Sequence, residues 1–151
     1  MQAYKIAIIG LGPKGLYAFE RLLAHLDTQE PDSTLEIHLF EKSGNFGAGK
    51  IYDPNQPDYL LMNYPNRNID VWATELPKSP MENTRSFSEW LVDSKNLPIE
   101  KVDDKFSPRA WVGTYLSECF QKLHEFGSAR SKIYKHCATV IDINKHKECH
   151  Q

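Results

Sequence analysis

Three glycines near the N-terminus have the spacing of a backbone turn that can approach a phosphate group. Gly10, Gly12 and Gly15 follow the apolar run Ile6–Ile9 and precede a stretch with helical periodicity. The first glycine of such a turn permits a tight exit from a strand, the second leaves room for a pyrophosphate, and the third lets the helix pack against the sheet. Free N–H groups and the dipole at the helix start favour an anion. The same spacing also occurs in strand–helix turns that hold no ligand.

An acidic residue lies where the ribose of a nucleotide would need a hydrogen-bond acceptor. The apolar run Leu35–Phe40 predicts a second strand, and Glu41 follows it, 26 residues after Gly15, where about 20 is usual. A carboxylate at this position can accept hydrogen bonds from both ribose hydroxyls. It disfavours a 2′-phosphate, because like charges would meet. These residues leave NAD, FAD and S-adenosylmethionine as candidate ligands.

A second glycine-rich segment, Ser43–Gly49, follows Glu41 almost at once. A simple NAD-binding domain would continue from its acidic residue into another helix, whereas this chain makes another turn. Two glycine turns near one pyrophosphate suit an extended ligand such as FAD. The residues leave open the alternative of a flexible loop with no ligand.

The elements around these turns predict an α/β fold. Lys5–Ile9 and Leu35–Phe40 are apolar enough for buried parallel strands, and a helix from Pro13 to about Asp27 would connect them as a βαβ unit. We therefore expect a Rossmann-like parallel sheet with helices on both faces. From about 43 to 107 the periodicity weakens and six prolines occur, so we expect a long loop insertion after the second strand that covers a ligand.

The rest of the chain predicts two helices and two short strands. Ser86 and Glu89 have the spacing of a capping box, which predicts a short helix inside the insertion. Further on, Ser107 has the character of a helix cap, Pro108 of a first helical residue and Gly127 of a helix stop. The runs 133–136 and 139–143 predict two closely spaced strands.

Four motifs in this order resemble a known family: GLGPKG, LFEK with the adjacent GNFGAGKIYD, YLLMN, and FSPRAWVGTYL. Together they resemble the FAD/NAD(P)-binding domain of an uncharacterised bacterial flavoprotein group. That group is similar to the flavoproteins with two dinucleotide-binding domains, among them the flavin-dependent N-hydroxylating monooxygenases. The resemblance covers about Ile6 to Ile143. It implies FAD as the cofactor and NAD(P)H as electron donor in the full-length protein.

The resemblance also implies roles for individual positions. It places Gly10, Gly12, Pro13, Lys14 and Gly15 around the FAD pyrophosphate, Glu41 at the adenosine ribose with Lys42 beside the adenine, and Gly47 and Gly49 along the pyrophosphate and ribityl chain. Leu61 and Asn63 would lie near the flavin, Arg109 in or near the pocket as a positional or anion-pairing group, and Val140 with its backbone towards the adenine.

The resemblance has one departure, at the C-terminus. In such flavoproteins the chain returns to the sheet through an Ala-Thr-Gly turn, which is absent after Ile143. We therefore expect residues 1–151 to be the N-terminal part of a FAD/NAD(P)-binding domain, a C-terminally truncated fold whose redox chemistry needs further regions. No catalytic residue is assigned, and the chain alone is expected to be inactive. The alternatives are an S-adenosylmethionine-dependent methyltransferase and a non-catalytic fragment without tight ligand binding.

Composition restricts the partners. The 151 residues carry a net charge of −2 with a pI near 6.3, which gives neither a basic surface for nucleic acid nor a polybasic membrane patch. The three cysteines do not suggest a disulfide scaffold, and the N-terminal apolar run is too short for a membrane span. We expect a cytoplasmic protein that binds a dinucleotide and an unknown small-molecule substrate.

Two further expectations concern metals and assembly. The spacing of Cys137, Cys149 and His150 matches no common zinc pattern, so no metal site is expected. The absence of a returning strand would leave an edge of the sheet open, which raises a homodimer as a hypothesis.

Overall fold

The fold is built on a three-stranded parallel sheet. The structure is a computed structural model that describes residues 4–29 and 35–145. The strands are β1 (Lys5–Ile9), β2 (Glu36–Phe40) and β3 (Lys132–His136), and β2 lies between the other two. Lys5 pairs with Glu36, which pairs with Lys132, so the three carboxyl ends are level. The predicted α/β class and both strands of the βαβ unit are confirmed.

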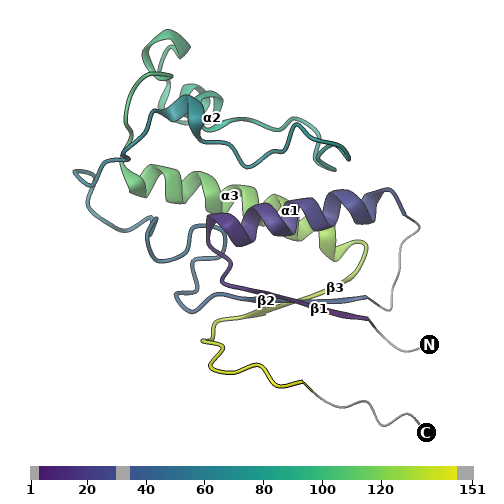
Figure 1. Cartoon of the computed structure of the whole chain (residues 1–151). Coiled ribbons are helices and arrows are strands. Elements are labelled where there is room, and N and C mark those ends of the chain that lie inside the picture. Colours follow the sequence, from purple (N-terminus) through teal and green to yellow (C-terminus); the bar gives the residue numbers. More distant parts are fainter. Residues whose placement is uncertain (1–3, 30–34, 146–151) are drawn as a thin grey trace, which may run out of the picture.

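Two helices cover one face of this sheet. They are α1 (Pro13–Asp27) and α3 (Arg109–Ser128), which lie side by side above the strands in Figure 1. Ile37 and Leu39 of β2 point towards them and are fully buried. The buried core joins the sheet, both helices and the insertion, through Leu11, Leu16, Phe19, Leu23, Ile37, Leu39, Phe87, Leu91, Tyr115 and Leu123. Apolar burial is therefore concentrated on one side of the sheet.

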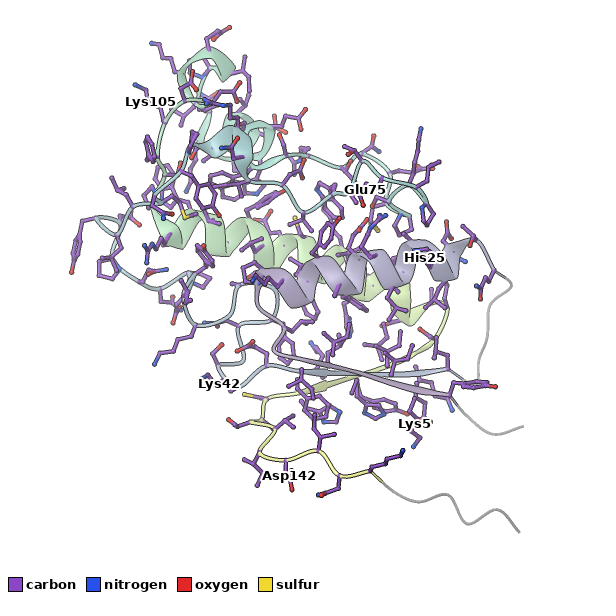
Figure 2. The ribbon with its side chains drawn as sticks, in the orientation of Figure 1. Lys5, His25, Lys42, Glu75, Lys105 and Asp142 are labelled. Carbon is purple, nitrogen blue, oxygen red and sulfur yellow. The ribbon has the colours of Figure 1, made fainter. Side chains whose placement is uncertain are left out.

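The predicted placement of helices on both faces is wrong for the described residues. On the face opposite α1 and α3, Ile9 and Tyr134 remain 49% and 41% exposed. The segment 137–145 runs back beneath this face without regular structure, where Figure 2 labels Asp142. The predicted strand 139–143 is also wrong, because polar residues such as Asp142 and Asn144 bond locally instead of forming a ladder.

The insertion between β2 and α3 contains one α-helix, as the sequence predicts. This helix, α2, spans Phe87–Lys95, and two 3-10 turns, η1 (Asn66–Asn68) and η2 (Ile99–Lys101), flank it. The Ser86 side chain accepts a hydrogen bond from the Glu89 N–H, and the Glu89 carboxylate accepts one from Ser86 N–H, so the predicted capping box is confirmed. The indole N–H of Trp90 donates to Glu118 at 2.7 Å and fixes α2 on α3.

Both predicted ends of α3 need correction. Pro108, and not Ser107, is the capping residue, because the backbone of Ser107 is engaged elsewhere. The N–H of Ser107 donates to the Asn66 side chain at 3.2 Å, and the Ser107 carbonyl accepts from the Met62 N–H at 2.9 Å. Gly127 does not stop the helix but lies inside it. A Cβ there would come within 2.6 Å of the Ile133 side chain, so Gly127 serves the packing of α3 on β3.

Among residues 4–29 and 35–145, no helix combines the length and the apolar character that crossing a bilayer requires. The expectation that Cys137, Cys149 and His150 form no metal site stays a prediction, because Cys149 and His150 lie outside the described residues.

Candidate dinucleotide-binding site

The first glycine turn is built where β1 passes into α1. Gly10 has φ +85°, and the N–H groups of Gly10 and Leu11 donate to the Phe40 carbonyl at 2.9 and 3.0 Å. A Cβ at Gly15 would stand 2.3 Å from the Gly10 carbonyl oxygen, so the close helix–strand packing demands glycine there. Both positions are therefore required by the fold itself.

Gly12 is different from its two partners. It caps α1 with φ −78° and ψ −163°, a backbone conformation that any residue can adopt. A Cβ at Gly12 would meet one backbone atom, Gly49 Cα, at the ordinary contact distance of 3.8 Å. Nothing in the described protein thus requires glycine at this position.

The start of α1 places the N–H groups of a first helical turn beside Gly12. Pro13 is the first helical residue, as predicted, and Gly12 supplies no side-chain cap. The N–H groups of Lys14 and Gly15 lie in the first turn, where a helix has no carbonyl partner for its donors. Lys14 is exposed. This end of α1 can accept an anion such as a phosphate.

The second glycine turn packs directly on the first. Gly47 N–H donates to the Leu11 carbonyl at 2.7 Å, and a Cβ at Gly47 would be 2.6 Å from the Leu116 carbonyl oxygen of α3. Gly49 has φ +63°, and a Cβ on it would lie 3.2 Å from Gly12 Cα. The turn is therefore a fixed structure, and two stretches of bare backbone meet at Gly12 and Gly49.

Glu41 stands at the carboxyl end of β2, beside both turns. Its N–H donates to the His136 carbonyl of β3 at 3.0 Å, and its side chain is buried. Ser43 donates to Oε1 of Glu41 through its N–H at 3.1 Å and its hydroxyl at 2.8 Å. The position of a Cβ added to Gly49 is 3.9 Å from Oε2. Ser43 therefore holds one carboxylate oxygen, and the other lies near the glycine turns.

Sequence reasoning missed this role of Ser43. The sequence offered one signal for it, because Ser43 is a hydroxyl residue two positions after the acid Glu41. At this spacing a side chain can form a local hydrogen bond. Lys42, between them, is exposed at the carboxyl edge of the sheet, as Figure 2 shows. Its carbonyl lies 3.9 Å from the Cys137 sulfur, and Val140 follows in the irregular segment after β3.

Leu61 and Arg109 are brought together, although 48 positions separate them. Leu61 forms an isolated antiparallel bridge with Pro108, and the Leu61 carbonyl accepts from Nε of Arg109 at 3.2 Å. The N–H of Arg109 donates to the Leu60 carbonyl at 2.8 Å. Arg109 thus fixes the segment around Leu61 on the start of α3, and Asn63, two residues on, is exposed.

The chain segment between the second glycine turn and Leu61 packs on α3 at Gly113. A Cβ there would be 1.8 Å from the Tyr52 carbonyl oxygen, so the backbone at Tyr52 rests directly on the helix. The close packing that a glycine inside this helix suggests is therefore present. Gly113 and Leu116, which Gly47 approaches, are three positions apart in α3, so the backbone at Tyr52 and the second turn contact the same side of this helix.

This arrangement fits a dinucleotide. Bare backbone at Gly12 and Gly49, the N–H groups of the first turn of α1 and a buried carboxylate at Glu41 all lie at one end of the sheet. Parallel sheets bind nucleotides at this carboxyl end.

Comparison with known proteins agrees with this geometry. A family model described as FAD-NAD(P)-binding matches residues 7–151. The chain belongs to the FAD-NAD(P)-binding family. The predicted resemblance and the FAD and NAD(P)H cofactors are thereby confirmed, and the methyltransferase alternative is not favoured.

Several curated relatives of this FAD-NAD(P)-binding chain are similar over most of its length. Nitrosuccinic acid synthase npaA of Aspergillus oryzae is 28% identical over 142 residues, 92% of this chain and 21% of the relative. An L-aspartate N-monooxygenase (nitrosuccinate-forming) of Streptomyces cremeus is 26% identical over 157 residues, 91% of this chain and 23% of the relative. Uncharacterized protein YdhS of Escherichia coli is 28% identical over 127 residues, 79% of this chain and 21% of the relative. The chain thus spans less than a quarter of the length of these relatives.

Proposed function

We propose that this chain binds FAD as the N-terminal part of a flavin-dependent oxidoreductase that takes electrons from NAD(P)H and oxygenates the nitrogen of a small amine. The family supports the cofactors, and the relatives named as aspartate N-monooxygenases support the reaction class. When bound, the flavin would supply the redox chemistry, and the protein its position and electrostatics.

One observation carries the assignment to the glycine turns. Gly12 has an ordinary backbone conformation and room for a side chain, yet it lies against Gly49 at the start of α1. A glycine that the fold does not need is explained by a ligand that does need it. A pyrophosphate at the N–H groups of Lys14 and Gly15 would occupy the space into which a Gly12 side chain would project.

The remaining residues divide into two groups. Glu41 would accept hydrogen bonds from the adenosine ribose through the carboxylate oxygen that Ser43 leaves free, and Lys42 and Val140 would lie beside the adenine. Gly47 and Gly49 would line the pyrophosphate and ribityl chain, with Leu61, Asn63 and Arg109 towards the flavin. Arg109 would act by positioning, because it already holds the Leu61 segment.

The test is isothermal titration calorimetry of the purified chain with FAD, ADP and adenosine 2′,5′-bisphosphate. FAD and ADP should bind, because Glu41 and the glycine turns together hold the adenosine pyrophosphate half. The 2′-phosphate compound should bind at least about tenfold more weakly, since its charge would meet Glu41. S-adenosylmethionine binding in place of FAD and ADP would contradict the proposal.

We also propose a cytoplasmic protein that can form a homodimer. In the described residues, β1 and β3 each pair on one side, so both edges of the sheet have free backbone groups. Size-exclusion chromatography with light scattering should give twice the monomer mass, and a monomer at all concentrations would contradict the dimer.

A further inference from the structure

A cavity of about 110 Å³ lies beside the first turns of α1, next to the glycine turns but lined largely by other residues. Three segments far apart in the sequence meet there: α1, the insertion and α3. Its polar groups come from Tyr17, Tyr52, Tyr64, Asn68 and Asp70, above an apolar floor that includes Val112 and Leu116. Of the described lining residues, Pro13 alone was placed above around the FAD pyrophosphate.

The carboxylate of Asp70 is held in position at the cavity wall. Its Oδ1 accepts the Trp72 N–H at 3.0 Å and lies 3.3 Å from the Tyr115 hydroxyl. That hydroxyl also lies 2.9 Å from the Arg85 carbonyl. Burial raises the pKa of Tyr115 far above its usual range, so its hydroxyl stays protonated and can donate. Asp70 is exposed, but these two contacts hold one oxygen of its carboxylate in position.

The three tyrosines add a second attraction for positive charge. An ammonium group is attracted to the face of an aromatic ring. Burial, together with the neighbouring Tyr52 hydroxyl, raises the pKa of Tyr64, which therefore remains a neutral ring with a hydroxyl at neutral pH. The tyrosines and Asp70 thus favour the same kind of ligand.

An anion is disfavoured in this cavity. Its described lining residues include no lysine, arginine or histidine, so a carboxylate or phosphate would meet Asp70 without a counter-charge. Pro13 has no backbone N–H and presents no donor from the helix start. The volume is far below the roughly 300–1,000 Å³ of pockets for drug-sized ligands, so a small group must be the occupant.

We propose that this cavity binds the ammonium end of a small primary amine, with Asp70 as its counter-ion and the tyrosine rings around it. The inference rests on the proposed function in one respect, namely that an amine is the substrate class. It assigns to Asp70 the selection of the amino group, while any carboxylate of the same substrate must be recognised outside the cavity.

The test is an NMR titration of the ¹⁵N-labelled chain with n-propylammonium chloride, sodium propionate and propan-1-ol at constant ionic strength. These probes have similar size and differ in charge. n-Propylammonium should give saturable shifts of the amide signals from residues 68–71, at an affinity at least about fivefold above those of the other two. Equal affinity for propionate, or no saturable shift with n-propylammonium, would overturn the inference.

Substitutions at Asp70 and Tyr64 separate the contribution of the carboxylate charge from that of the aromatic ring. Asp70→Asn keeps an oxygen that accepts from Trp72 and should weaken n-propylammonium binding about tenfold. Asp58→Asn, a change at an exposed acid outside the cavity, should leave it unchanged. Tyr64→Phe should retain binding and Tyr64→Leu should lose it. Undiminished binding in Asp70→Asn would overturn the inference, and if that variant does not fold, the wild-type contrast between amine and propionate decides.

An FAD titration of the same samples keeps the two proposals apart. If FAD binds and n-propylammonium does not, the cavity assignment is wrong and the FAD site stands. If n-propylammonium binds through Asp70 and FAD does not, the ammonium site stands and the proposed flavin function is contradicted.

Discussion

The two glycine turns use the same residue for different reasons. In the second turn, Gly44, Gly47 and Gly49 all have positive φ, a backbone conformation that glycine adopts without strain. In the first turn, Gly10 and Gly15 are also demanded by the backbone, but Gly12 is not. The difference teaches that a shared motif contains both architectural and ligand-dependent positions, and that Cβ geometry can separate them.

The largest expected effect contrasts Gly15 with Gly12. A methyl group at Gly15 would stand 2.3 Å from a backbone oxygen that has little freedom to move. We expect Gly15→Ala to lower the free energy of unfolding by about 2 kcal/mol or more. Thermal unfolding followed by circular dichroism checks this. Gly12→Ala is the matched control and should stay within about 0.5 kcal/mol of the wild type. A Gly15→Ala protein as stable as that control would refute the division between the two positions.

The next effect concerns Glu41, which the two turns share. Glu41→Gln keeps an acceptor for Ser43 but removes the charge, and we expect FAD affinity to fall about tenfold with little change in stability. The same variant should narrow the gap between ADP and adenosine 2′,5′-bisphosphate, because the repulsion of the 2′-phosphate is gone. Calorimetric titration measures both, and an unchanged preference between the two nucleotides would remove Glu41 from the ribose site.

A smaller effect is expected at Gly44 of the second turn. Its φ is +76°, but a Cβ would meet the Cys137 sulfur at 3.4 Å, which is ordinary contact. Gly44→Ala should therefore carry the strain of a left-handed conformation alone, about 1 kcal/mol, and leave FAD affinity unchanged. Denaturant unfolding checks the first part. A loss of FAD affinity without loss of stability would mean that the second turn contains a ligand-dependent position as well.

The smallest effect is expected at Ser43. Ser43→Ala removes the 2.8 Å hydroxyl bond to Glu41 and retains the backbone bond at 3.1 Å. FAD affinity should fall about twofold to threefold, since one neutral donor to a carboxylate is lost while another remains. Fluorescence titration with FAD gives the value, and a tenfold loss would show that the hydroxyl itself takes part in binding.

Local sequence signals predicted the parts of the site that depend on neighbouring residues. The exit of β1 at Gly10, the start of α1 at Pro13 and the position of Glu41 after β2 each follow from a few adjacent residue types. The capping box of α2 was predictable for the same reason. In all of these cases the residue types that carry the signal lie within a few positions of one another.

Long-range packing explains what the sequence did not predict. The bare contact of Gly12 with Gly49 and the contact of Gly113 with Tyr52 depend on how the insertion lies on α3. The ammonium cavity joins residues from α1, the insertion and α3, where no periodicity relates them. The prediction of helices on both faces was wrong for a similar reason. The apolar character of the strands does not determine which element covers each face of the sheet.

The most direct test of the account is the affinity of the Gly12→Ala chain for FAD, measured beside its thermal stability. The account predicts an unchanged unfolding temperature and an affinity at least about tenfold below that of the wild type, because the methyl group enters the space of the pyrophosphate. A Gly12→Ala chain that unfolds at the wild-type temperature and binds FAD as tightly as the wild type would contradict it.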